Sequence, residues 1–270
     1  MKKPVKHRYV FFWLFVVFGL ITFYAYFLKI NCLFSCPVSN EEKYDSTFLS
    51  INSEAKLDTL LFKRFRKTKH DTAATVLFLD VFLRKRFYNG YSVLNKEQNW
   101  IALCLGKLVW SHFQFPVIPD DILLHPSAAC SQQGILFQNE LDKLKIQCAV
   151  IKFYPLSRYS AGHYAISVLY GNSYHFFDPN KEPTIVDSTM PSIETIVDKK
   201  LYVKMYSKPS NMAFQDFFKR KNFASVTQTP FRKGNMYYFQ VISAMLSRWL
   251  WLFFLVLYAI LSLKTLVKKA

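Results

Sequence analysis

The chain has 270 residues, of which 51% are apolar and 18% aromatic, and its formal charge is +17. This length accommodates one medium-sized domain together with membrane segments, and five scattered cysteines do not form the disulfide framework of a small secreted protein. Because the chain has no zinc-knuckle, Walker or RRM signature and its cations flank apolar segments, we expect contact with anionic lipid and no nucleic-acid partner.

The N-terminal segment is expected to be a membrane anchor. Residues 1–8 form a basic tail, and residues 9–30 are expected to form a transmembrane helix that is uncharged from Tyr9 to Leu28. About 20 apolar residues are needed to cross the hydrocarbon core. A cleaved signal peptide is the alternative, but its apolar region would be only about 7–15 residues long. In the linker that follows (31–56), Cys32 and Cys36 either pair, carry lipid or pack at the membrane edge.

Residues 57–223 are expected to form one extracytoplasmic domain that begins with helices. The apolar spacing predicts helices at 57–65, 72–87 and 95–113, followed by a loop at 116–126. The third helix would present one apolar face, formed by Ile101, Leu105, Leu108 and Val109. Basic clusters at 63–67 and 84–86 either contact anionic headgroups or are solvated helix ends. Cys104 and Cys148 are expected to be buried in the core.

A cysteine at the start of a predicted helix follows that loop. Ser127 has the character of an N-cap, so a helix running to about residue 145 would place Cys130 in its first turn. Gly134, Phe137 and Leu141 would share its inner face with Cys130. The free N–H groups and the helix dipole at this end favour a thiolate. A buried, inert cysteine is the alternative reading of Cys130 alone.

Three strands are predicted next, at 146–154, 163–170 and 174–178. The second begins with His163 and the third ends with Asp178. If Gly171 and Asn172 are the two turn residues, Tyr170 pairs with Ser173, and Asp178 lies on the same sheet face as His163. A register shift of one residue would move Asp178 to the other face. Cysteine, histidine and aspartate in this arrangement are typical of a nucleophile, its base and the group that orients the base.

The remaining elements lead back to a membrane. Residues 192–206 are expected to add a strand pair and residues 211–223 an aromatic, basic helix, before a linker at 224–235. Residues 236–263 are expected to form a second transmembrane helix, in which Arg248 reaches toward the headgroups, with a re-entrant helix as the alternative. A basic tail closes the chain at 264–270. Both basic tails are expected in the cytoplasm, which places the domain outside.

The motif around these three residues resembles a known family. It reads Cys130-x3-Gly134-x2-Phe137, then Gly162-His163-Tyr-Ala, then Phe177-Asp178-Pro179. Over about residues 95–190 it is similar to the transglutaminase-like core of the papain-like cysteine enzymes. That resemblance implies an α+β fold with the nucleophile helix packed on an antiparallel sheet, flanked here by two transmembrane helices. It also implies that Cys130 attacks a carbonyl, His163 takes the thiol proton and Asp178 orients the ring, without metal or cofactor.

These features predict a membrane-anchored cysteine hydrolase or acyl transferase. Ala128 and Ser131 replace residues common in cross-linking members of the family, so a peptidase or amidase is favoured. Its substrate would be a peptide or protein amide, attacked through a thioester intermediate. One alternative is a cysteine peptidase of the leader-trimming type. Another is an inactive scaffold that binds a membrane protein partner, and an inert Cys130 would favour that scaffold.

Overall fold

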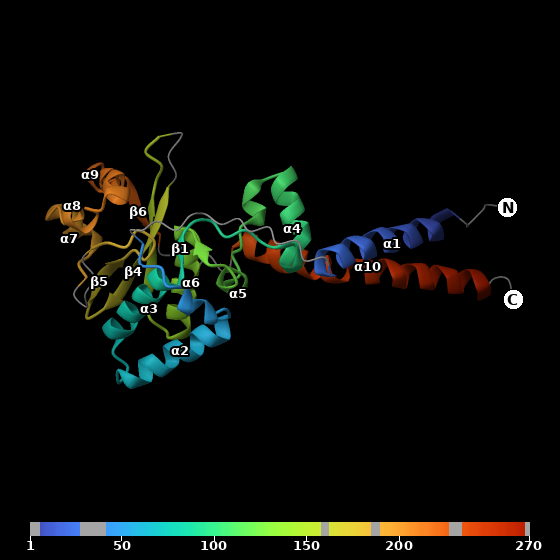
Figure 1. Ribbon diagram of the computed structural model, residues 1–270, viewed down its shortest axis with the longest axis horizontal. Helices are drawn as coiled ribbons and strands as arrows, with labels where there is room; N and C mark the ends of the chain where they lie inside the picture. Colours follow the sequence, from blue (N-terminus) through green and yellow to red (C-terminus); the bar gives the residue numbers. More distant parts are fainter. Residues whose placement is uncertain (1–5, 28–41, 158–161, 185–189, 227–233, 268–270) are drawn as a thin grey trace. The chain divides into compact units, whose positions relative to one another are not determined.

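The computed structural model describes residues 6–27, 42–157, 162–184, 190–226 and 234–267 of an α+β protein. The chain forms two compact units, each built from discontinuous segments (Figure 1). The helical unit comprises Met1–Phe34, Val93–Phe115 and Tyr238–Ala270, and the sheet unit comprises Ser35–Ser92 and Pro116–Tyr237. Residues 93–115, which the sequence placed inside the 57–223 domain, thus group with the apolar helices.

The helical unit contains two helices that are long and apolar enough to cross a membrane. They are α1 (Lys6–Phe27) and α10 (Asn235–Val267). Aromatic rings join them, with Phe12 against Tyr258 and Phe18 against Phe254. The inserted segment adds α4 (Lys96–Leu108) and the 3-10 helix η2 (Ser111–Gln114). Cys32 and Cys36, which were expected to pair, carry lipid or pack at the membrane edge, lie outside the described residues.

The sheet unit is organised around four antiparallel strands in the order β5-β4-β3-β6. Their bounds are β3 (Cys148–Phe153), β4 (His163–Tyr170), β5 (Ser173–Phe177) and β6 (Phe223–Val226). The three strands predicted from the sequence are confirmed, and β6 is an additional edge strand beside β3. A separate parallel pair joins β1 (Tyr88–Asn89) to β2 (Ser127–Ala128).

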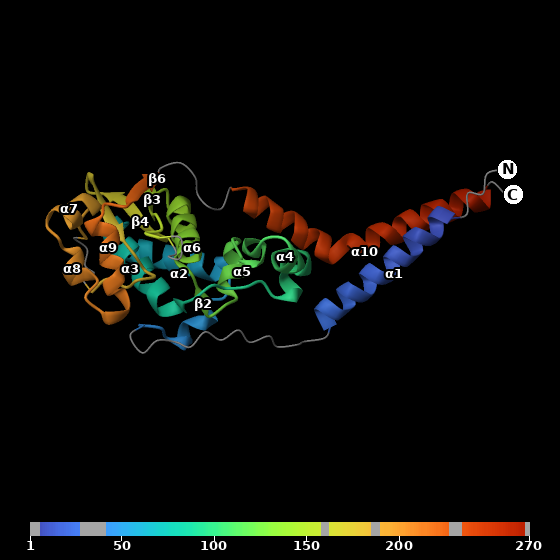
Figure 2. The same cartoon turned by 90° about the horizontal axis from the view of Figure 1, so that it is seen from above.

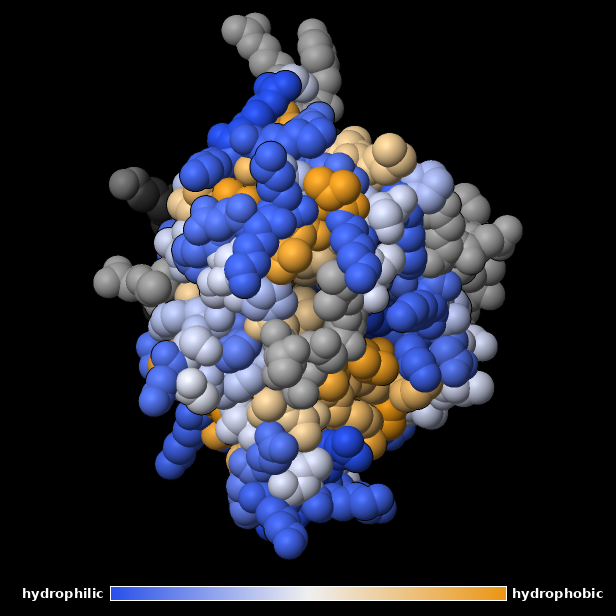
Figure 3. Space-filling model, turned by 90° about the vertical axis from the view of Figure 1, so that its left-hand side faces the viewer, coloured by the Kyte–Doolittle hydropathy of each residue, from blue (hydrophilic) through white to orange (hydrophobic). Residues whose placement is uncertain are grey.

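Helices cover both faces of this sheet (Figures 1 and 2). One set comprises η1 (Ser46–Ser50), α2 (Glu54–Lys67), α3 (Thr72–Arg86), α5 (Pro119–Leu123) and α6 (Cys130–Lys143). The other comprises α7 (Ile193–Asp198), α8 (Tyr202–Met205), η3 (Pro209–Phe214) and α9 (Gln215–Lys219). Adjacent residues of β5 point to opposite faces, so Phe177 meets Phe137 of α6 while Phe176 meets Phe218 of α9. The surface over α7–α9 is mostly hydrophilic around apolar areas (Figure 3).

Two sequence predictions for the C-terminal part of the sheet unit are wrong. Residues 192–206 form α7 and α8 instead of a strand pair, because the Ser192 hydroxyl caps the Thr195 N–H and Ile193 and Ile196 are buried one turn apart. The expected helix at 211–223 is split between η3 and α9, and its last residue already belongs to β6.

Earlier in the chain, the expected loop at 116–126 contains the short helix α5.

Two predictions of exposure or burial are also wrong, and the burial expected of Cys148 is only partial. Arg84 and Arg86 are buried at 2% and 1% exposure, because their guanidinium groups donate to backbone carbonyls inside the unit. They therefore serve neither as headgroup contacts nor as solvated helix ends. In the helical unit, Cys104 is exposed rather than buried, and so are Leu108 and Val109 of the predicted apolar face. Cys148 is only partly buried.

Candidate active site

Cys130 is the first residue of α6, and its cap differs from the one expected. Ser127 lies in β2, and Ala129 occupies the N-cap position. The side chain of Gln132, one turn into the helix, accepts a hydrogen bond from the Ala129 N–H at 3.1 Å and donates to the Pro116 carbonyl at 3.1 Å. The Ser127 prediction is therefore wrong, because an internal glutamine caps this end. Cys130 still lies where N–H groups have no helical partner and the dipole is positive.

His163 opens β4, and Asp178 directly follows β5. The register pairs Tyr170 with Ser173 and Ile166 with Phe177, which confirms the predicted two-residue turn. Gly171 and Asn172 both have positive φ, as in the type I′ turns that match the twist of a hairpin. Asp178 therefore lies on the His163 face, and its Oδ2 is 2.9 Å from Nε2 of the imidazole. Both side chains are buried.

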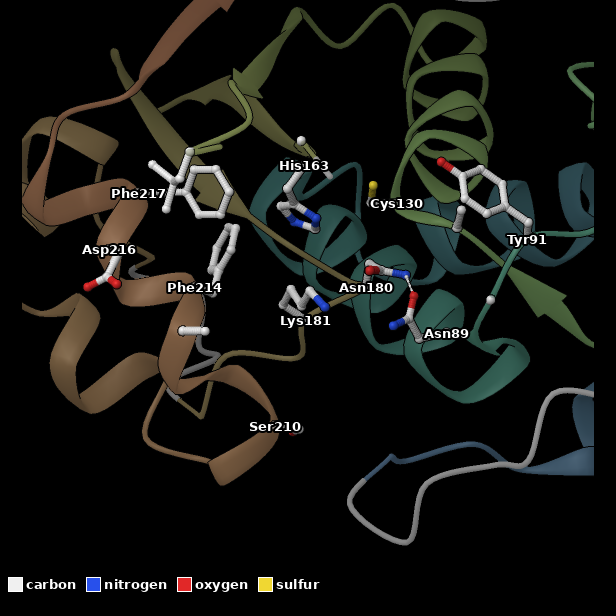
Figure 4. Close-up of a pocket in the computed structure, with 15 residues that line it drawn as sticks. Asn89, Tyr91, Cys130, His163, Asn180, Lys181, Ser210, Phe214, Asp216 and Phe217 are labelled. Atoms are coloured by element: carbon white, nitrogen blue, oxygen red, sulfur yellow. Dashed lines mark hydrogen bonds between the residues drawn. The ribbon is translucent and has the colours of Figure 1, made fainter. Parts of the chain in front are cut away.

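The thiol of Cys130 meets the other side of this imidazole. A hydrogen bond joins the sulfur to the His163 ring, and the backbone N–H of Tyr164 donates to the same sulfur. Since Nε2 is taken by Asp178, Nδ1 is the ring nitrogen that remains for the thiol. Figure 4 shows the sulfur beside the ring. Sulfur, imidazole and carboxylate thus form one continuous chain of hydrogen bonds.

The electrostatics of this chain favour a thiolate–imidazolium pair. Burial alone would raise the pKa of the Cys130 thiol, but the charge and hydrogen bond of His163 and the Tyr164 N–H outweigh it, so the pKa is lowered. Burial would lower the pKa of His163, but Asp178 and Cys130 raise it to about 9. Both shifts favour the form in which the ring carries the proton and the sulfur carries the charge.

Asp178 is held ionised by groups that the sequence did not reveal. Its carboxylate accepts hydrogen bonds from the Tyr206 hydroxyl at 3.0 Å and the Lys181 N–H at 3.1 Å. Burial would raise the pKa of Asp178, but His163 and these two donors lower it. Tyr206 lay in a region predicted as strand, so no pattern pointed to it.

A buried ion pair lies behind Asp178. Arg84 Nε is 2.7 Å from Asp80 Oδ2, and both side chains are almost fully inaccessible. The same guanidinium donates to the Asp178 carbonyl at 3.4 Å and the Pro183 carbonyl at 3.2 Å. It therefore fixes the chain on both sides of residues 179–182. The sequence did carry a signal here, since Asp80 and Arg84 are one turn apart in an otherwise apolar stretch.

Cys130 and His163 line a pocket of about 430 Å³. In Figure 4, Phe214 and Phe217 form one wall, Tyr91 lies beyond Cys130, and Lys181 extends beneath the imidazole. Polar residues also line the pocket near the thiol, where Asn180 Nδ2 donates to Asn89 Oδ1 at 3.1 Å and to the Ala128 carbonyl at 3.3 Å. A pocket of this size accommodates a side chain or short peptide segment.

Within the part of the chain that the structure describes, no group of three His, Cys, Asp or Glu side chains could hold a metal ion. Comparison with protein-family models, with curated proteins and with solved structures gave no match for this chain. The site is therefore interpreted from its geometry. The structure brings Cys130, His163 and Asp178 together as expected from the hairpin register, while their catalytic role stays a prediction.

Proposed function

We propose that this protein is a membrane-anchored cysteine hydrolase that cleaves a peptide or amide bond. The observation that supports this most is the hydrogen-bonded chain from the Cys130 sulfur through His163 to the buried carboxylate of Asp178, open to a pocket at the sulfur end. Such a chain supplies an activated nucleophile, a proton carrier and a fixed counter-charge.

The proposed reaction begins with the proton on the His163 ring and the negative charge on the Cys130 sulfur. The Cys130 thiolate attacks the substrate carbonyl, and the tetrahedral oxyanion that forms is stabilised by the free N–H of Cys130 at the start of α6. The intermediate collapses as the imidazolium of His163 gives its proton to the leaving amine, leaving a thioester on Cys130. Neutral His163 then takes a proton from water as the water attacks the thioester; collapse releases a carboxylic acid and the Cys130 thiolate, and the proton on His163 restores the starting pair. Asp178 stays ionised throughout.

We also propose a papain-like or transglutaminase-like fold for the sheet unit. Two features support it: the nucleophile stands at the start of a helix that packs on an antiparallel sheet, and the base and orienter come from adjacent strands. The pocket lacks an obvious site for an acceptor amine, and water is always present, so hydrolysis is favoured over acyl transfer.

The membrane placement of α1 and α10 belongs to the same proposal. Both helices meet the length and hydropathy needed for a span, and the cations at both chain ends favour a cytoplasmic location of the termini. The sheet unit would then face the outer side of the membrane, where peptide substrates would reach the pocket.

Reactivity of Cys130 tests the function. The experiment starts from a background in which Cys32, Cys36 and the exposed Cys104 are replaced by serine, so that only Cys130 and Cys148 remain. Iodoacetamide labelling near neutral pH should then be fast and centred on Cys130. Cys130→Ala should abolish that labelling, whereas Cys148→Ala should leave it unchanged, since burial raises the pKa of Cys148 to about 12. Labelling of Cys130 no faster than that of a free thiol, with no His163 dependence, would favour a non-catalytic scaffold.

A further inference from the structure

The hairpin of α4 and η2 exposes an apolar tip. Leu108, Val109 and Trp110 are 77%, 70% and 51% exposed, although they are consecutive and large. The hairpin is tightly closed behind them, because a Cβ at Gly106 would lie only 2.7 Å from the Cβ of Gln114. The tip is therefore exposed although the hairpin behind it is packed. In water, these three large apolar side chains would remain in unfavourable contact with solvent.

Two side chains of α4, Asn99 and Trp100, direct their polar groups toward α10. Asn99 is only 1% exposed, and its Nδ2 donates to the Gln240 carbonyl at 3.1 Å and to Ser243 Oγ at 2.7 Å. The Ser247 hydroxyl donates to Asn99 Oδ1 at 3.2 Å, and Trp100 Nε1 donates to the Ser247 carbonyl at 2.9 Å. Polar groups inside and apolar groups outside are what a lipid environment selects, because lipid cannot satisfy hydrogen bonds.

Side-chain contacts within the helical unit join α4 to α1. The Trp100 ring stacks on Phe18 at 6.2 Å, and Lys96 Nζ lies 4.6 Å from the centre of the Tyr24 ring. Both Phe18 and Tyr24 fall inside Arg8–Tyr26, the part of α1 that is long and apolar enough to cross a membrane. Hence the first part of α4 packs against the C-terminal part of this span, near Tyr24.

We propose that residues 108–110 insert into the interfacial layer of the lipid bilayer, on the leaflet that contains Tyr24. Lys107 and His112 are exposed on either side of the tip and would meet anionic headgroups. Trp110 suits the boundary between headgroups and acyl chains. The hairpin would thus be a third membrane-embedded element of the helical unit. This inference rests on the proposed membrane placement of α1 and is independent of the chemistry at Cys130.

Spin-label depth measurements test this placement. The full-length chain, with its native cysteines replaced by serine, carries one nitroxide at Val109→Cys and is reconstituted in vesicles of three parts phosphatidylcholine to one part phosphatidylglycerol. Trp13→Cys on α1 (62% exposed) is the lipid reference, and Val203→Cys on α8 (51% exposed) is the aqueous reference. We expect the ratio of collisions with oxygen to collisions with a water-soluble nickel chelate at position 109 to lie between the ratios at positions 203 and 13, clearly above that at position 203.

Each other result has a defined meaning. A ratio at position 109 equal to that at position 203 places the tip in water and overturns the proposal. An immobilised label shielded from both reagents means that protein covers the tip, which also overturns it. An aqueous ratio at position 13 removes the membrane placement of α1 itself, and leaves the labelling of Cys130 untouched.

A second measurement keeps all native cysteines. Lipids brominated near the glycerol backbone should quench the fluorescence of the parent chain more strongly than that of Trp110→Phe, because Trp110 would lie at their depth. Equal fractional quenching of the two chains would contradict insertion even if the cysteine-free variants fail to fold.

Discussion

Replacing Asp178 with asparagine separates the charge of the site from its geometry. An asparagine carbonyl can still accept the hydrogen bond from Nε2 of His163, now 2.9 Å from the carboxylate, so the ring keeps its orientation. The negative charge is lost, while the burial that lowers the pKa of His163 remains. We therefore expect Asp178→Asn to retain a correctly placed but neutral imidazole, and to lose most of its thiolate at neutral pH.

The size of this effect follows from the shifted pKa. The pKa of His163 rises from an ordinary 6.5 to about 9, and at 1.36 kcal/mol per pH unit this corresponds to about 3 kcal/mol in favour of the charged ring. Asp178 is the largest contributor to that rise, with Cys130 second. Losing the Asp178 part should lower the population of the thiolate–imidazolium pair at pH 7 by up to about a hundredfold.

The pH dependence of Cys130 alkylation reports this population, in the background that retains only Cys130 and Cys148. In the parent, the pair forms as pH rises through the lowered pKa of the thiol and loses its ring proton near pH 9, so the alkylation rate constant should change at both limits. In Asp178→Asn the upper limit should move to lower pH and the alkylation rate at pH 7 should fall. Asp178→Ala should lose more, because the ring is then no longer oriented.

Stability provides an independent check on the same charge. His163 has a raised pKa in the folded state, so its contribution is fully present below 6.5 and is lost as pH rises through about 9. The lowered pKa of the Cys130 thiol acts in the opposite direction over the same interval, so the test uses a Cys130→Ala background. In that background the protein should lose unfolding free energy as pH rises through this interval, and the addition of Asp178→Asn should reduce the loss. Asp216→Asn is the matched control, because Asp216 lines the same pocket but is 45% exposed and paired with Lys219. An Asp178→Asn profile identical to that of the parent would refute this electrostatic account.

Two further variants test the support of the site and of the hairpin. Arg84→Ala leaves Asp80 buried without its cation, so thermal unfolding in detergent should show a loss of roughly 3–5 kcal/mol, against less than about 1 kcal/mol for the exposed pair broken by Lys219→Ala. Equal losses would mean that the buried pair does not stabilise the sheet unit. Gly106→Ala must push Gln114 away and should lower the melting temperature by an amount equivalent to about 1–3 kcal/mol, whereas Gly19→Ala, with open space around it, should change it little.

The part of the site that the sequence predicted is the part governed by local rules. Gly171 and Asn172 favour a two-residue turn, and that turn fixes the register for the whole hairpin. Once the register is set, alternation alone places Asp178 on the side of His163. The helix that begins at Cys130 was also predicted from its local sequence, although the side chain that caps it is Gln132 instead of Ser127.

The rest depends on contacts between distant segments, which no local pattern encodes. Tyr206, the residue that directly follows α8, reaches Asp178 from a segment that was predicted as strand. The cations of 84–86 were read as surface charge because basic residues at a helix end are usually solvated. In the helical unit, periodicity assigned Leu108 and Val109 to one apolar face, but periodicity does not show whether protein or another medium covers that face.

The physical cost of the site favours an enzyme over an inactive scaffold. Asp80, Arg84, His163 and Asp178 are each at most 3% exposed, and they form two ionisable pairs; burial raises the pKa of Asp80 despite the neighbouring Arg84, so keeping this group inside the unit is costly. Replacing such buried networks with apolar residues is often neutral or stabilising, so a domain that only binds a partner gains little from keeping one. In this unit the network ends at the one imidazole that touches the Cys130 thiol beside the pocket. Strained or costly groups that converge on a reactive atom are typical of catalytic sites, where stability is sacrificed for reactivity.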